Sequence, residues 1–305
     1  MSEAPAVVPA PPTKLDDVKG WFWAVDQLMF DWFLTRQNED EGQRGDLLEL
    51  GAYMGKSAIF LGSYLQEGER FTVCDLFDSP APDASNEKEM EGSYSTLTRK
   101  AFEANYLAFH DELPTVIMAT TSVVADRVRA DSCRFVHIDA SHLYEHVHGD
   151  IAASRVVTTP GAVVVFDDYR SEHCPGVAAA VWGAVDRGDL KAICITGTKL
   201  YATWGDAEPV RKELLAWLET RKDLWHGVEE VAGAPLIRIG GEHAVAPVLP
   251  ESRYQPEPAP APKPAPVAAR PAPAPVRRPQ SKVKKLAKDL LPPIVTRAIV
   301  GQRKR

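Results

Sequence analysis

The sequence lacks the features that mark membrane, secreted and zinc-thiolate proteins. No stretch of its 305 residues approaches the roughly 20 apolar residues that cross a bilayer. The N-terminus, MSEAPAVVPAPPTKLDD, has no basic segment followed by an apolar run, as a secretory signal would. The four cysteines, Cys74, Cys133, Cys174 and Cys194, form no CxxC pair. We therefore expect a cytoplasmic protein with reduced, mostly buried thiols.

The net charge of −7 conceals an unequal distribution along the chain. Residues 251–305 hold 13 Lys and Arg against three acids, which is +10. Subtracting this from −7 leaves −17 for residues 1–250. Such an acidic body argues against a nucleic-acid groove, whereas the basic tail suits a phosphate-rich surface.

Composition divides the chain into four regions. Residues 1–17 are rich in Pro and Ala and hold too few large apolar side chains to offset the entropy of ordering, so we expect disorder. Residues 18–245 form one domain, which is long enough to bury a full α/β core. Residues 246–280 make an extended Pro/Ala-rich linker, with ten prolines between 256 and 279. Residues 281–305 form a basic amphipathic segment.

Short β-rich runs alternate with helical patterns in the domain, which predicts a doubly wound, Rossmann-like α/β fold with a seven-stranded, mostly parallel sheet. The runs KAICITG and LYATWG flank a turn at Thr198–Lys199 and should form a closing antiparallel hairpin. PLIRIG is the last expected strand. The aromatic-rich segment 18–37 has helical spacing and should cover the sheet edge, or else form a lid over a substrate. The polar segment 78–92 should be a substrate-covering or disordered loop.

A glycine-rich segment, ELGAYMGKS at residues 49–57, joins the first strand to a helix. It lies at the crossover where open α/β sheets bind ligands. Without a Cβ, Gly51 and Gly55 let the backbone turn sharply and approach a flat adenosine. The GxGxxG of dinucleotide enzymes and the GxxxxGK[ST] of P-loops are both absent. Asp75 ends the second strand, where its carboxylate can accept hydrogen bonds from both ribose hydroxyls.

The ExGxxxGxS arrangement, followed by an acid after the second strand, resembles the class I S-adenosylmethionine-dependent methyltransferases. In that family these positions cradle the methionine portion of the cofactor and grip its ribose. Ser122 matches the place near the adenine, although an N-cap of the following helix explains it equally well. The resemblance implies a cofactor site built from Glu49, Gly51, Tyr53, Gly55, Ser57, Asp75, Ser122 and Asp139.

Carboxylates end the next two strands. The fourth strand ends at Asp139, and the fifth ends at Asp167 and Asp168. Three carboxylates at one sheet edge would repel one another unless a positive charge lay between them, and Mg²⁺ is the natural candidate. A metal there would orient a substrate hydroxyl and lower its pKa. The alternative is that these acids are helix N-caps or solvated loop residues.

The segment IDASHLYEHV with the following Asp150, and VVFDDY after a Pro-Gly turn, resemble the metal-dependent small-molecule O-methyltransferases. That group includes catechol-type enzymes and bacterial enzymes that modify sugars. The resemblance covers about residues 40–205, and the Asp-Asp pair together with His142 is closer to the sugar-modifying enzymes. It implies three metal ligands, Asp139, Asp167 and Asp168.

His142 follows Asp139 by three residues and can reach the same crevice. An imidazole suits a general base, but a hydrogen bond to a metal ligand or to the backbone is an equal alternative. His146 and His148 should be exposed on the following helix.

The leading hypothesis is a Mg²⁺-assisted, S-adenosylmethionine-dependent O-methyltransferase acting on a hydroxyl of a sugar, glycolipid or natural product. One alternative dispenses with the metal and uses His142 alone as the base. Another is a non-catalytic, methyltransferase-like binding module tethered by its basic tail. That tail could bind the anionic inner membrane surface or a partner protein. Alternatively, it is a solvated run of charges without a role. We expect no nucleic-acid partner, and a homo-oligomer is a further option; the sequence does not identify the acceptor.

Overall fold

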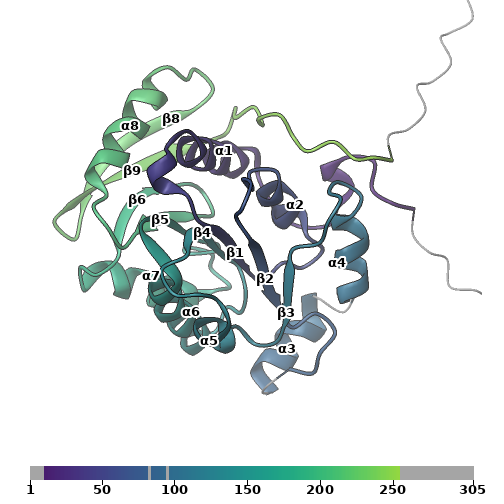
Figure 1. The fold of residues 1–305 in the computed structure, drawn as a ribbon. Helices are drawn as coiled ribbons and strands as arrows, with labels where there is room; N and C mark the ends of the chain where they lie inside the picture. Colours follow the sequence, from purple (N-terminus) through teal and green to yellow (C-terminus); the bar gives the residue numbers. More distant parts are fainter. Residues whose placement is uncertain (1–9, 82–83, 94–95, 255–305) are drawn as a thin grey trace, which may run out of the picture. The chain divides into compact units, whose positions relative to one another are not determined.

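A nine-stranded sheet organises the part of the chain that the structure, a computed structural model, describes: residues 10–81, 84–93 and 96–254. The strand order is β3-β2-β1-β4-β5-β7-β6-β9-β8 (Figure 1). The strands are β1 (Asp46–Leu50), β2 (Phe71–Asp75), β3 (Thr115–Met118), β4 (Cys133–Ile138), β5 (Thr158–Phe166), β6 (Lys191–Ile195), β7 (Leu200–Thr203), β8 (Trp225–Val231) and β9 (Ala234–Gly240).

The pairing confirms the expected doubly wound fold. Strands β3, β2, β1, β4 and β5 pair in parallel. From β1 the chain adds strands outward to β3, and it then returns to add β4 on the other side of β1, so the switch point lies between β1 and β4. β7 pairs antiparallel with both β5 and β6, which confirms the closing hairpin.

The sheet has nine strands rather than the expected seven. β9 contains the expected last strand PLIRIG, whereas β8 was not expected, and both lie beyond β6. β8 pairs antiparallel with β9 along its whole length. Most of its side chains are exposed, including Trp225 and Val228. The sequence WHGVEEV therefore has no buried apolar face that would have marked it as a strand.

Helices cover both faces of the sheet, with α1, α2 and α4 on one face and α5, α6 and α7 on the other (Figure 1). Alternate residues of β1 serve the two cores, with Leu47 facing the α1 side and Leu48 and Leu50 the α6 side. None of the described helices combines the length and apolarity needed to cross a membrane. The helices are α1 (Ala24–Glu39), α2 (Lys56–Gly62), α3 (Ala84–Ser93), α4 (Arg99–Tyr106), α5 (Val124–Arg127), α6 (Tyr144–Val157), α7 (Pro175–Asp186) and α8 (Glu208–Glu219).

The aromatic-rich segment forms a shorter helix than the expected 18–37. Helix α1 begins at Ala24, and Phe30 and Phe33 on its inner face are completely buried against the sheet. The covering-helix interpretation is therefore correct for α1. Trp21 and Trp23 precede the helix and are 64% and 57% exposed, so they do not belong to the core.

Ordered structure extends past both expected domain boundaries. Leu15, which we expected in a disordered tail, is buried in a 3-10 helix at residues 15–17. The Ser252 hydroxyl, expected within the linker, is also buried and donates a hydrogen bond to the carbonyl of Pro12. We expected disorder because this segment has few large apolar side chains. The burial of Leu15 and the hydrogen bond from Ser252 to Pro12 stabilise it instead. Residues 1–9 and 255–305, with most of the Pro/Ala-rich linker and the whole basic segment, lie outside the described residues.

Two smaller expectations have different outcomes. The polar segment 78–92 is not a continuous loop, because α3 begins within it at Ala84. The cysteines are free and buried, as expected.

Candidate active site

The loop between β1 and α2 turns sharply by using left-handed backbone conformations. The φ angles are 79° at Gly51, 48° at Tyr53 and 91° at Gly55. A Cβ on Gly51 would lie 2.0 Å from the carbonyl oxygen of Asp139. The lack of a side chain at Gly51 thus makes room for the backbone at the end of β4, whereas we had expected it to make room for adenosine. This close approach places the loop directly beside Asp139.

Asp75, at the end of β2, anchors that loop. Its Oδ2 accepts hydrogen bonds from the amides of Ala52 (2.7 Å) and Tyr53 (3.1 Å), and its Oδ1 accepts one from Phe77 (2.7 Å). Burial raises the pKa of Asp75, and these three amides partly oppose the rise. A carboxylate offers about four lone-pair sites, so the three amides leave about one site for a ribose hydroxyl, whereas the sequence suggested that two would bind.

A cavity of about 1350 Å³ opens beside this loop, at the carboxyl ends of β1, β2, β4 and β5. Single ligands usually occupy about 300–1,000 Å³, so the cavity has room for a cofactor and an acceptor. Glu49 and Gly55 are not part of its lining. The expected site residues that line it are Gly51, Tyr53, Ser57, Asp75, Ser122, Asp139, His142, Asp167 and Asp168.

The acidic cluster contains a buried lysine that the sequence reasoning missed. The Nζ of Lys199, at the end of the turn before β7, lies 2.6 Å from Asp167 Oδ2 and 3.0 Å from His137 Nε2. Burial alone would lower the pKa of Lys199, but Asp167, Asp139 and Asp26 raise it to about 12. The ammonium supplies part of the positive charge that we had assigned to a metal. A lysine directly before the apolar run LYAT was the available signal.

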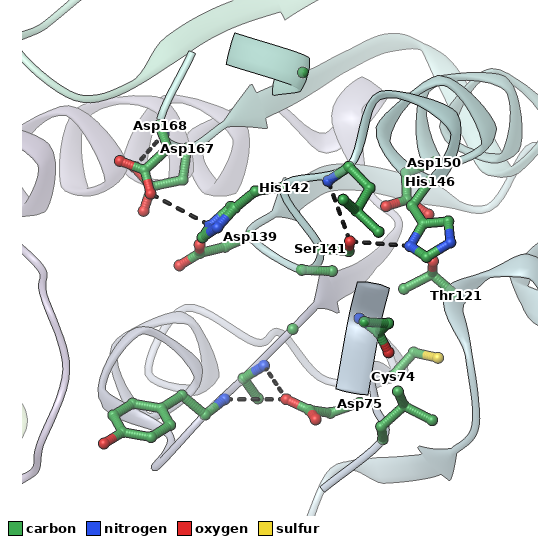
Figure 2. Close-up of a pocket in the computed structure, with 18 of the residues that line it drawn as sticks. Cys74, Asp75, Thr121, Asp139, Ser141, His142, His146, Asp150, Asp167 and Asp168 are labelled. Carbon is green, nitrogen blue, oxygen red and sulfur yellow. Dashed lines mark hydrogen bonds and ion pairs between the residues drawn. The ribbon is translucent and has the colours of Figure 1, made fainter. Parts of the chain in front are cut away.

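The carboxylates do not all converge. Ligand atoms of Asp139, Asp167 and His137 lie within 4.8 Å of one another. Asp168 has a left-handed φ of 52° and turns away. Its Oδ2 lies 3.5 Å from His142 Nε2. Figure 2 marks this contact with a dashed line. The expected group of three acids is therefore a pair of acids, with Asp168 next to it.

The acid pair fits a divalent cation. Burial and the neighbouring charge of Asp167 raise the pKa of Asp139 well above its ordinary value, although Lys199 opposes the rise. Two carboxylates face one ammonium, so the ionised pair carries a surplus of negative charge, and carboxylate oxygens are the donors that Mg²⁺ prefers. The N-cap interpretation does not apply here, because Asp139 and Asp167 face Lys199 and each other.

Glu49 lies beneath the cavity rather than in its wall. It is completely buried, and its Oε1 is 2.8 Å from His137 Nδ1. Burial raises the pKa of Glu49 to about 8, while hydrogen bonding by Ser57 partly counteracts this. A polar chain thus runs from Glu49 through His137 and Lys199 to Asp167, and it connects β1, β4, β7 and β5.

The far end of the cavity holds a buried acid with a free acceptor atom. Asp150 is 2% exposed, burial raises its pKa to about 7, and its Oδ2 has no hydrogen-bond partner among the described residues. Cys74 and Thr121 lie nearby (Figure 2). A donor such as the amino group of adenine would satisfy this oxygen, so the cavity fits the cofactor that the loop implies.

Two residues near this end differ from expectation. Ser122 does not cap α5, whose N-cap is Val123; its hydroxyl lies 2.7 Å from that of Thr120. His146 is not exposed on its helix but lines the cavity, with Nδ1 2.9 Å from the Ser141 hydroxyl. His148 is exposed, as expected.

Sequence comparison agrees with this site. Residues 48–169 match a family model described as a methyltransferase domain. The matched span contains the glycine loop, Asp75 and the acidic cluster. The match identifies residues 48–169 as a methyltransferase-family segment, and the Rossmann-like strand order agrees with that match. No curated protein sequence matches the chain.

Several solved methyltransferase structures have a similar fold. The O-methyltransferase NovP is 18% identical, with a TM-score of 0.47, over 59% of this chain and 81% of that one. CalS11, a TDP-rhamnose 3′-O-methyltransferase of calicheamicin biosynthesis, is 20% identical, with a TM-score of 0.41, over 60% and 80%. A putative O-methyltransferase from Klebsiella pneumoniae is 14% identical, with a TM-score of 0.44, over 66% and 93%. At these identities the likeness describes the general fold.

Replacing Asp75 by asparagine should weaken cofactor binding. An amide group cannot accept from all three backbone N–H groups, so the loop loses at least one charge-assisted hydrogen bond. We expect the Kd for S-adenosylhomocysteine to rise by about tenfold to a hundredfold in isothermal titration calorimetry. Asp78→Asn, on the same connection but outside the cavity lining, is the matched control. An unchanged Kd for Asp75→Asn would exclude this role.

Proposed function

We propose that the protein transfers the methyl group of S-adenosylmethionine to a hydroxyl of a sugar, glycolipid or natural product, assisted by a divalent cation such as Mg²⁺. The observation that carries the proposal is that expected cofactor, metal and base residues line the same cavity. The cofactor loop, the acid pair Asp139 and Asp167, and His142 all line a space larger than one ligand needs. The methyl donor and an acceptor hydroxyl would meet there.

The residues of the chain supply a base and hold it in place. The loop anchored by Asp75 would hold S-adenosylmethionine, which when bound would supply the methyl group from its sulfonium sulfur to the acceptor oxygen. His142 takes the hydroxyl proton, and Asp168, 3.5 Å from its Nε2, stabilises the resulting imidazolium. Asp139 and Asp167 would hold the cation, which when bound lowers the pKa of a coordinated hydroxyl.

The mouth of the cavity supports a ring-shaped acceptor. Trp21 and Trp23 both line it, and both side chains are more than half exposed. The Trp21 ring stacks on Tyr53, with centroids 6.0 Å apart and planes inclined by 15°. Exposed aromatic faces beside a cavity favour a ligand with an apolar face, and a sugar ring has one.

The basic segment 281–305 supports a membrane-associated version of the same function. Its sequence places leucines on one helical face and lysines opposite, a pattern that binds anionic membrane surfaces. A cytoplasmic enzyme held at the inner membrane surface would reach glycolipid hydroxyls. This segment lies outside the described residues.

Chelation distinguishes the metal-assisted reaction from the metal-free alternative. We expect methyl transfer to a panel of glycosides, nucleotide sugars, catechols, amines and thiols to be detectable with at least one sugar acceptor. Excess EDTA should then lower the rate by about a hundredfold, and added Mg²⁺ should restore it. Full activity in EDTA would instead support His142 acting alone. Transfer only to nitrogen or sulfur acceptors would contradict the O-methyl assignment.

A further inference from the structure

Lys199 is the most constrained charged residue of the site. Its side chain is 1% exposed, and lysines are rarely buried unless they are paired. Besides Asp167 and His137, the rings of Phe22 and Phe30 lie 5.9 and 6.0 Å from its Nζ. The aromatic rings and the acids both attract the ammonium, which restricts its movement.

The ammonium touches the same acid that the proposed metal would use. Asp167 Oδ2 is its nearest partner, at 2.6 Å, and its charge also acts on Asp139. His137, the other hydrogen-bond partner of the ammonium, is itself held in place, because its Nδ1 lies 2.8 Å from the Oε1 of buried Glu49. Lys199 is thus built into the metal-binding part of the cluster.

We propose that Lys199 is a buried cation of the active site, which holds Asp167 in place and weakens the binding of a divalent cation to the acid pair. This inference rests on the metal part of the proposed function. A fixed positive charge beside a dication raises the electrostatic cost of its binding, and the burial of Lys199 limits the screening of this repulsion by solvent. Wild-type protein should therefore bind the cation more weakly than the bare acid pair would.

Manganese binding tests this directly, without any measurement of activity. The Kd for Mn²⁺, measured by calorimetry on the full chain, should fall by about tenfold or more in Lys199→Met. Lys199→Arg keeps the charge and should bind Mn²⁺ about as weakly as wild type. Lys212→Met, which removes an exposed lysine on α8, should match wild type. Equal Mn²⁺ affinity in Lys199→Met and wild type would overturn the proposal.

Thermal unfolding gives a second readout. Lys199→Met leaves buried acids without their counter-charge, so its Tm should fall, and Mn²⁺ should raise that Tm more than it raises that of wild type. If Lys199→Met folds only when Mn²⁺ is present, the proposal is supported; failure to fold even with Mn²⁺ contradicts it. The double variant Lys199→Met/Asp167→Asn removes both charges and should lose the extra Mn²⁺ stabilisation.

The two proposals can fail separately. If neither wild type nor Lys199→Met binds Mn²⁺, this inference fails together with the metal part of the proposed function. Methyl transfer in EDTA then shows whether the O-methyl part stands. If both proteins bind Mn²⁺ equally, only the role of Lys199 is wrong.

Discussion

Asp139→Asn should lower kcat for methyl transfer by about a thousandfold or more, which corresponds to roughly 4 kcal/mol of transition-state stabilisation. Asp139 lines the cavity beside the cofactor loop and forms a close pair with Asp167. An amide there would not supply the negative charge that the proposed divalent cation needs next to an acceptor hydroxyl. The loop itself is anchored by Asp75, so the Kd for S-adenosylhomocysteine should change by less than about threefold.

The two quantities need separate measurements, kcat by product formation at saturating acceptor and Kd by calorimetry. Asp126→Asn, an exposed acid on α5, is the matched control and should leave both unchanged. Retention of more than about a tenth of wild-type kcat by Asp139→Asn would contradict a direct role in the reaction. A large loss of cofactor affinity would instead assign Asp139 to cofactor binding, the second role that the resemblance implied.

The orientation of Asp168 shows what the sequence could and could not provide. The Asp167–Asp168 pair after a buried strand correctly predicted acids at the cavity. Successive side chains of a strand point to opposite faces, however, so strand geometry favours Asp167 and Asp168 pointing away from each other. The left-handed backbone at Asp168 then turns its side chain toward His142. Both acids were placed correctly, but their convergence was not.

The buried polar chain beneath the cavity was beyond local sequence reasoning. Glu49 and His137 are polar residues within apolar strands, and Lys199 ends a turn. Each has an ordinary local explanation, and only the pairing of β1, β4, β5 and β7 brings them together. By contrast, the glycine loop was recognisable because its constraint is local: a strand, a left-handed turn and a helix in immediate succession.

Gly51→Ala should be the most destabilising single-methyl change in this loop. The added Cβ would lie 2.0 Å from the Asp139 carbonyl oxygen and 2.7 Å from the Ala140 Cα, whereas ordinary contact begins at 3.4 Å. Both neighbours are backbone atoms, so the ends of β1 and β4 would have to separate by roughly 1 Å or more in a close-packed interior. We expect the free energy of unfolding to fall by at least about 3 kcal/mol, with loss of measurable S-adenosylhomocysteine binding.

Gly68→Ala separates the steric effect from the conformational one. Gly68 has a similar φ of 84°, but a Cβ there would meet nothing within 4 Å. Its replacement should cost only the strain of a left-handed alanine, about 1 kcal/mol in urea unfolding, and should leave cofactor binding intact. The difference between the two variants measures the contact between the loop and β4. Equal destabilisation would show that backbone strain alone selects glycine at residue 51, and that the loop does not depend on this contact for its place beside Asp139.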